Sequence, residues 1–136
     1  LLRSREAGGD SVFASALLAE IAARQGDDPA AAADALRALR GLRPTIAAPF
    51  PLPLDATLRL LASRARPEVA GEVFEVAAAT RPSWDLAYWG GAQLFSRGGQ
   101  LGCRRAERFA RQLSRFGWRD EEIYDLLRAC TAGRTD

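Results

Sequence analysis

The chain has 136 residues and a net charge of +2, and all 19 of its basic residues are Arg. This length suffices for one domain with a sizeable core, without a metal or a disulfide. The net charge is too small to argue for nucleic-acid binding by itself, and no uninterrupted apolar run approaches the length that spans a membrane. Because Ala is abundant and Lys, His, Asn and Met are absent, the composition resembles that of a GC-rich bacterial genome. We expect the sequence to be a segment of a longer bacterial protein.

The first part of the chain predicts two helices. Asp10 or Ser11 can cap a helix that runs to about Gln25. Its large apolar residues recur at spacings of three and four, as in a helix face that packs: Phe13, Leu17, Leu18 and Ile21. Gly26 ends this helix. Asp28 is then a good cap and Pro29 suits the first position of a helix over 30–40, which must lie antiparallel to the first.

Residues 44–53 interrupt the helical pattern with four prolines, Pro44, Pro49, Pro51 and Pro53. Their neighbours Ile46, Phe50, Leu52 and Leu54 are apolar. We interpret the segment as an extended connection that lies across the helices. A polyproline-type ligand for another module is the alternative.

The remainder predicts helices over 55–64, 67–80, 83–97, 101–116 and 120–130, with Pro67 and Ser83 at two of the starts and a turn at Gly98-Gly99. The sequence thus predicts a single all-α domain of about seven helices. Its antiparallel hairpins cover about 11–41, 55–80 and 83–116, and the closing helix covers 120–130.

Gly26 and Gly98, which end corresponding helices, lie 72 positions apart. The predicted helix starts at 11, 83 and 119 fit a spacing of 36, with the place near 47 taken by the proline segment. Within 26–39, Gly26 at the turn, Ala31 five residues later and Ala38-Leu39 further on resemble the second half of a tetratricopeptide repeat. Residues 84–113 resemble it more loosely, through Trp84, Gly90 or Gly91, Phe95, Gly98, Ala106 and Ala110. The resemblance implies hairpins stacked as an α-α superhelix. It also implies a groove, lined by the first helix of each pair, that binds a peptide or partner protein.

Catalytic signatures are absent from the sequence. Without His, no Ser/His or Cys/His pair and no zinc-type spacing can be assembled. The glycine pairs at 90–91 and 98–99 follow no strand and lead to no Gly-Lys-Ser/Thr, so they are not phosphate loops. We therefore expect a non-catalytic scaffold with no cofactor and no metal. An accessory or regulatory domain of a larger bacterial enzyme is an alternative.

Trp89 is the first candidate for partner binding. On the helix over 83–97, Trp84, Tyr88, Gly91 and Phe95 share one side and predict a core face. Trp89 projects toward Asp85 and Gln93, where an aromatic could anchor a ligand. The alternative is that Trp89 packs under the proline segment or against the preceding helix pair.

An arginine stripe is the second candidate. Its members fall at i, i+4, i+7 and i+11 of the helix over 101–116 and share one side: Arg104, Arg108, Arg111 and Arg115. The stripe could bind carboxylates or phosphates, which gives an anion or nucleic-acid binding module as another alternative. It could also be a solvated face that reflects genome composition. The acidic residues of the closing helix could then neutralise part of it: Asp120, Glu121, Glu122 and Asp125.

Cys103 and Cys130 are expected at the same end of the domain, because they lie at opposite ends of antiparallel helices. A bridge between them would imply an oxidising compartment such as the periplasm. Two buried free thiols are the commoner arrangement and would suit the cytoplasm, which we favour from the sequence.

Overall fold

The computed structural model describes residues 9–42, 54–128 and 130. Within this part the chain forms seven α-helices and one 3-10 helix, with no strand. The predicted all-α class is therefore confirmed, whereas the proline segment 44–53 lies outside the described residues. In chain order the elements are α2 (Gly9–Arg24), α3 (Asp28–Arg40), α4 (Asp55–Arg64), α5 (Pro67–Thr80), α6 (Asp85–Phe95), α7 (Gly99–Gln112), η1 (Leu113–Phe116) and α8 (Asp120–Leu126).

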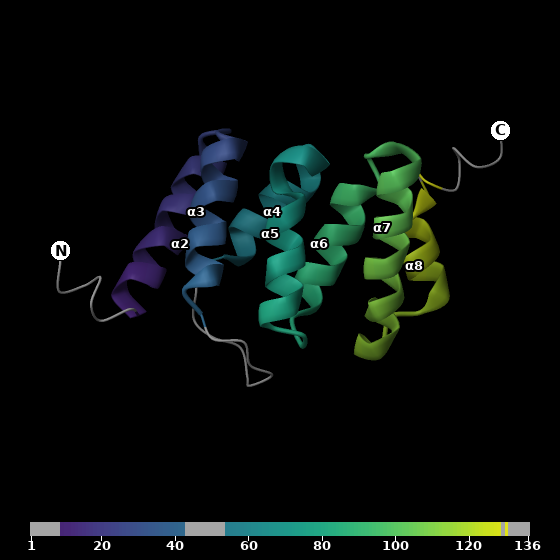
Figure 1. Ribbon diagram of the computed structural model, residues 1–136. Helices are drawn as coiled ribbons and strands as arrows, with labels where there is room; N and C mark the ends of the chain where they lie inside the picture. Colours follow the sequence, from purple (N-terminus) through teal and green to yellow (C-terminus); the bar gives the residue numbers. More distant parts are fainter. Residues whose placement is uncertain (1–8, 43–53, 129, 131–136) are drawn as a thin grey trace.

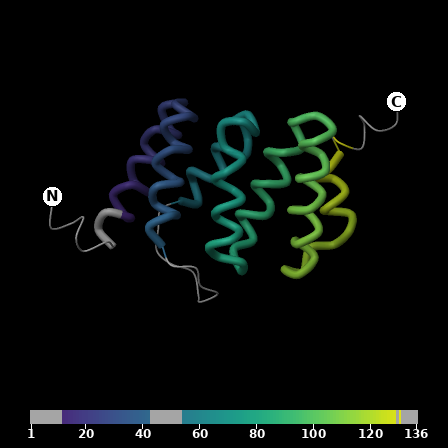
Figure 2. The backbone as a smooth tube through the Cα atoms, in the orientation of Figure 1, coloured from purple at the N-terminus to yellow at the C-terminus, as the bar shows by residue number. Residues whose placement is uncertain are grey.

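The helices stand in a row that begins with α2 and ends with α8 (Figure 1). The chain reverses direction between α2 and α3 and between α6 and α7 (Figure 2), and each of these pairs packs closely. The intervening helices differ: α4 packs mainly against α6 and α2, whereas α5 packs against α3 and α6. The predicted hairpin over 55–80 therefore makes most of its contacts with its neighbours in the row.

Helices α4, α5 and α8 start at Asp55, Pro67 and Asp120 as expected, whereas other starts differ by one or two residues. Asp27, not Asp28, caps α3, and its carboxylate accepts the N–H of Ala30 at 3.2 Å. The helix expected from Ser83 begins instead at Asp85. The helix expected over 101–116 starts at Gly99 and ends as the 3-10 turn η1, after which Gly117 takes a left-handed conformation with φ 87°. These shifts leave the order of the helices unchanged.

The buried face of α2 is the opposite of the one expected. Its core residues are small, with Ala16, Ala19 and Ala23 fully buried. The large apolar residues are exposed instead: Phe13 by 45%, Leu17 by 41%, Leu18 by 51% and Ile21 by 52%. Alanine faces let helices approach closely, and the packed face of α3 is also largely Ala. The small residues therefore form the contact, and the large ones are left on the surface.

Glycines admit aromatic rings into the core around α6. A Cβ at Gly91 would lie 2.7 Å from the Phe109 ring, and one at Gly90 would collide with the Phe74 ring. The Phe109 ring thus occupies the space that a side chain at position 91 would need. The predicted core residues Tyr88 and Phe95 are buried.

Two arginines join successive members of the row. Arg97 donates to the backbone carbonyls of Ala62 and Ala65, each at 2.6 Å. Arg64 likewise donates to the carbonyl of Ala23, and it pairs with Asp28 at 2.9 Å. Both arginines thus donate to backbone carbonyls at the carboxyl-terminal end of a neighbouring helix, where the last carbonyls lack a full set of intrahelical partners. Desolvation by burial lowers the pKa of Arg97 from its ordinary value, but the guanidinium remains charged at neutral pH.

These contacts fix how α2, α4 and α6 correspond. The acceptor Ala23 lies two positions before Gln25, and the acceptor Ala62 lies two positions before Arg64. Gln25, Arg64 and Arg97 are therefore equivalent. Because α4 packs against both α2 and α6 and each contact joins two carboxyl-terminal ends, the three helices run in the same direction. Gln25 and Arg97 lie 72 positions apart, the same interval as Gly26 and Gly98.

Candidate partner-binding surfaces

A row of apolar side chains crosses the exposed sides of α2, α4 and α6. Eight positions before the equivalent residues stand Leu17, Ala56 and Trp89. Four positions before them stand Ile21, Leu60 and Gln93. Equivalent positions on parallel neighbouring helices point the same way. With Phe13 and its equivalent Asp85, these residues make one surface, which we call the first-helix face.

The exposure of the first-helix face varies between its helices. Phe13, Leu17, Ile21 and Asp85 are exposed, and the members from α4 are half-buried, as are Trp89 and Gln93. The predicted residues Asp85, Trp89 and Gln93 therefore share their face with the large apolar residues of α2. The sequence contained the signal for this, because 13, 17 and 21 lie 72 positions before 85, 89 and 93.

Trp89 lines a recess of about 230 Å³ with Arg59, Asp85, Leu86 and Trp118. The Arg59 guanidinium lies over the Trp89 ring, 5.8 Å from its centroid. Trp89 therefore contacts the preceding helix pair, as one sequence alternative held, and still lines a surface recess. Such a recess can hold an apolar or aromatic side chain, with a cation and an anion available for polar groups at its edge.

Sequence reasoning missed Trp118, as it missed Arg59 and Leu86 of the same recess. Trp118 follows the left-handed Gly117, and its backbone N–H donates to the carbonyl of Leu113 at 3.3 Å. This turn carries the indole back from the end of η1 toward α6. The local sequence shows a Trp after a turn Gly, but no spacing relates Trp118 to Trp89.

Gln93 lies on the first-helix face but outside the recess, whose lining includes Asp85 and Trp89. Its backbone carbonyl accepts from the Ser96 hydroxyl at 2.7 Å and from Arg97 at 3.3 Å. Its side-chain Oε1 is buried and has no hydrogen-bond partner in the described part of the chain. The structure thus brings together two of the three predicted residues, with Gln93 one turn further along.

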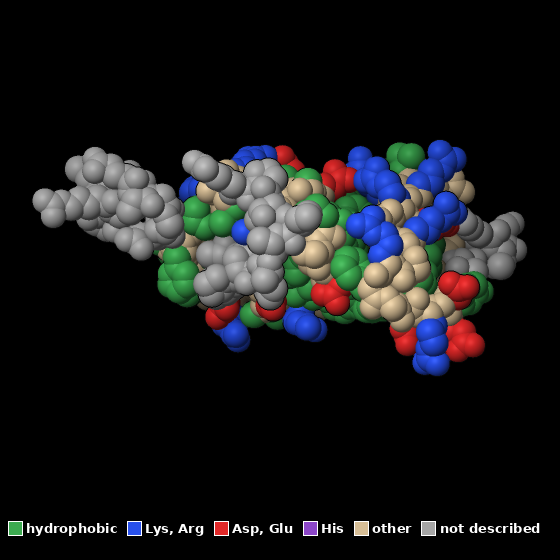
Figure 3. Space-filling view, turned by 90° about the horizontal axis from the view of Figure 1, so that it is seen from below, with side chains coloured by type: hydrophobic (Ala, Val, Ile, Leu, Met, Phe, Trp, Pro, Cys, Tyr) green, Lys and Arg blue, Asp and Glu red, His purple; other side chains and the backbone are tan. Residues whose placement is uncertain are grey.

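The arginine stripe is exposed on α7 and η1, and basic side chains gather on this part of the molecule (Figure 3). Arg108 pairs with Glu75 of α5 at 2.6 Å, and Arg115 donates to the Gln112 amide oxygen at 2.5 Å. Neither Arg104 nor Arg111 has a carboxylate within 4.0 Å among the described residues. The stripe therefore has one acidic partner in this part of the structure.

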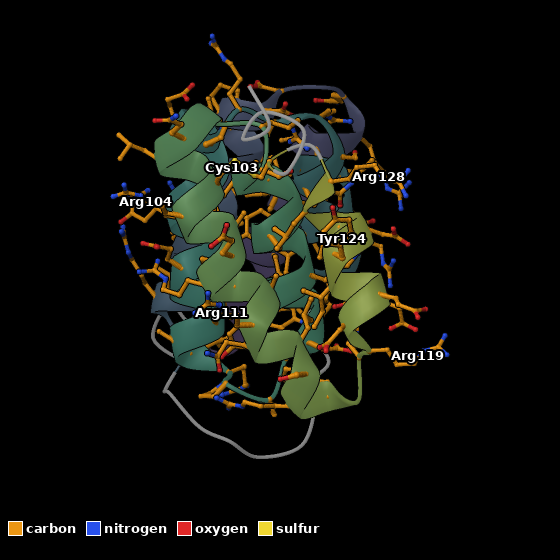
Figure 4. All side chains as sticks on the ribbon, turned by 90° about the vertical axis from the view of Figure 1, so that its right-hand side faces the viewer. Cys103, Arg104, Arg111, Arg119, Tyr124 and Arg128 are labelled. Atoms are coloured by element: carbon orange, nitrogen blue, oxygen red, sulfur yellow. A yellow bond between two sulfur atoms is a disulfide. The ribbon has the colours of Figure 1, made fainter. Side chains whose placement is uncertain are left out.

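Helix α8 does not supply that partner. Glu122 pairs with Arg119 at 3.4 Å and Asp125 pairs with Arg128 at 3.0 Å. Arg119 and Arg128 lie on the α8 side of this end of the molecule, whereas Arg104 and Arg111 lie on the α7 side (Figure 4). The expectation that α8 neutralises the stripe is wrong for these two carboxylates, because they point to the other side.

Cys103 and Cys130 form a disulfide, with their Cα atoms 5.5 Å apart. The alternative of two free thiols is therefore wrong. The bridge joins α7 to a residue beyond α8 and closes a loop across a separation of 27 residues. None of the residues 120–126 of α8 is buried, so the bridge is a main attachment of this short helix.

No group of three or more His, Cys, Asp or Glu among the described residues could hold a metal. In the same part of the chain, no helix has the length and apolar character needed to cross a membrane. No protein-family model, no curated protein and no solved structure matches this chain. A proposal for its function therefore rests on its surfaces.

Proposed function

We propose that this chain is a non-catalytic scaffold that binds a peptide segment of a partner protein on the first-helix face. The recess between Trp89 and Trp118 anchors the peptide. The observation that carries the proposal is the exposed apolar side of α2, at Phe13, Leu17 and Ile21. The register of the helices aligns this side with Leu60 of α4 and with the recess at Trp89 of α6. Monomeric proteins rarely leave a large apolar patch exposed, and such patches commonly serve as interaction sites.

The dimensions of the face suit a short extended segment. Neighbouring helices pack about 8–10 Å apart, so the exposed sides of α2 and α6 are separated by about 20 Å. An extended chain covers about 3.3 Å per residue, so about six residues reach from one to the other. Apolar side chains of the peptide contact Leu17, Ile21 and Leu60, and one large side chain enters the recess.

The resemblance to tetratricopeptide repeats agrees with this proposal, since it places the groove on the first helices of the pairs. The 72-residue interval between equivalent positions supports a stacked, superhelical arrangement of the same kind. The disulfide supports a location in an oxidising compartment, such as the periplasm or the cell exterior, because such bonds persist there.

The experiment is selection from a phage-displayed library of about twelve random residues, long enough to cross the face. The dissociation constant of the tightest peptide is then measured by fluorescence polarisation. Loss of an aromatic anchor costs about 2 kcal/mol or more, so Trp89→Ala should weaken binding about 30-fold. Tyr124→Ala is the matched control, because Tyr124 is an exposed aromatic on α8.

The proposal is overturned if the library yields no peptide whose affinity depends on Trp89. A second contrary outcome combines two results. In it, Trp89→Ala unfolds the protein, and Trp118→Ala folds normally but leaves peptide binding unchanged. Circular dichroism melts of both variants separate these outcomes, because a surface anchor contributes little to the melting temperature.

A further inference from the structure

A second recess lies between α5, α6 and α7, and none of its lining residues belongs to the first-helix face. Its volume is about 410 Å³, and its lining comes from α5, α6 and α7: Glu75, Ala78, Tyr88, Arg108, Phe109 and Gln112. A neighbouring hollow of about 340 Å³ is lined by Arg104, Glu107, Arg108, Arg111 and Gln112. Arg108 and Gln112 line both, so the two hollows lie next to each other.

The floor of the first hollow is aromatic. Tyr88 and Phe109 line it, with ring centroids 6.1 Å apart, and Phe116 packs behind Tyr88 at 5.7 Å. The two lining residues are 9% and 5% exposed, so only a small part of each ring reaches the hollow. Such a floor accepts an apolar or aromatic side chain from a ligand.

The wall of the second hollow is positively charged. Arg104 and Arg111 have no carboxylate partner among the described residues, and the pair between Arg108 and Glu75 is solvent-exposed. Exposed pairs of this kind contribute little to stability, so Arg108 can exchange Glu75 for a carboxylate of a ligand. Three guanidinium groups are therefore available to carboxylates, which they can bind in bidentate geometry.

From this combination we infer a second binding site, specific for an acidic peptide segment in which a Phe or other large apolar residue is flanked by Asp or Glu. The apolar residue contacts Tyr88 and Phe109, and the flanking carboxylates pair with Arg104, Arg108 and Arg111. Nucleic acid fits less well, because sequence-independent binding of single strands uses aromatic faces on which bases stack. The inference is independent of the function proposed for the first-helix face.

The test uses two fluorescein-labelled hexapeptides, Asp-Glu-Asp-Phe-Glu-Asp and the same peptide with Ala in place of Phe, and fluorescence polarisation. The Phe peptide should bind about fivefold more tightly than the Ala peptide, because the hollow buries part of the Phe ring. Raising the salt concentration from about 50 to about 300 mM should weaken the binding of both peptides, because salt screens the attraction between their carboxylates and the arginines.

Arg104→Glu with Arg111→Glu should weaken binding of the Phe peptide at least about tenfold. Arg119→Glu with Arg128→Glu is the control, since it changes the net charge equally on the α8 side. Ala78→Leu fills the aromatic hollow without changing charge, so it should reduce the Phe peptide to the affinity of the Ala peptide. Trp89→Ala should change neither affinity, which separates this site from the first-helix face.

Three results would overturn the inference. The first is absence of binding by the Phe peptide at low salt. The second is equal weakening by the α7 and α8 charge variants, which would mean non-specific attraction. The third is tighter binding of an oligothymidylate of about twelve nucleotides than of the Phe peptide, which would assign the stripe to nucleic acid.

Discussion

The Arg97 guanidinium donates to the carbonyl oxygen of Ala62 at 2.6 Å, and this contact repeats the one that Arg64 makes with Ala23. In both contacts a charged side chain donates to a carbonyl in the last turn of a neighbouring helix, across the boundary between successive pairs. The repeated contact sets the register of α2, α4 and α6, and it thereby identifies the residues of the first-helix face.

Arg97→Gln should lower the free energy of unfolding by about 1–2 kcal/mol, because two charge-assisted hydrogen bonds to carbonyls are lost. Urea denaturation followed by circular dichroism measures the change. Arg37→Gln is the control, since Arg37 forms an exposed pair within one helix and such pairs contribute little. Equal effects of the two substitutions would contradict the role given to Arg97.

Thr57→Val should stabilise the protein by about 1 kcal/mol. Thr57 is fully buried in α4, and its Oγ1 has no hydrogen-bond partner in the described part of the chain. Val has nearly the same shape and removes the unpaired hydroxyl, whereas Thr57→Ser keeps the hydroxyl and loses a methyl group. A melting temperature that falls with Val and holds with Ser would show that the hydroxyl is satisfied.

Reduction of the disulfide should lower the free energy of unfolding by about 3 kcal/mol, as expected for a loop of this length. Amide hydrogen exchange should show loss of protection first in α8, whose residues 120–126 are not buried. Thermal melts with and without dithiothreitol measure the effect, and a variant with Cys103→Ser and Cys130→Ser shows the effect of the reagent alone. A wild-type melting temperature insensitive to dithiothreitol would contradict a bridge.

Large substitutions should be harmful on the alanine side of α2 and tolerated on the opposite side. Ala19 is fully buried, so Ala19→Leu should cost about 1–3 kcal/mol through overpacking. Leu17→Asp with Ile21→Asp should change the melting temperature little, because both residues are exposed. If the Leu17→Asp, Ile21→Asp variant melted at a lower temperature than Ala19→Leu, the large apolar residues of α2 would be its core face, as the sequence suggested.

The order of the helices and the all-α fold class could be predicted from the sequence, because Pro and Gly mark the helix ends and apolar spacing marks most helices. The packing face of α2 could not, since both of its sides are apolar. Alanine contacts are favoured by the close approach of α3, which is a property of the pair. Likewise, the sequence placed Cys103 and Cys130 at one end, but their pairing depends on how α8 docks.

The recesses were harder to predict than the helices. Trp89 and Asp85 were identified because they share a helix side, whereas Trp118 reaches them only through the turn at Gly117. The pair between Arg108 and Glu75 joins residues 33 positions apart on α7 and α5. Neither relationship leaves a local spacing in the sequence.

The central claim is that α2, α4 and α6 present one continuous binding surface. The most direct measurement is the dissociation constant of a peptide selected on the wild-type protein, determined for the Leu17→Asp, Ile21→Asp double variant. We expect binding to weaken about tenfold or more, since two apolar contacts are lost, with an unchanged melting temperature. An affinity equal to that of the wild type, while Trp89→Ala still abolishes binding, would confine the site to the recess and contradict the continuous surface.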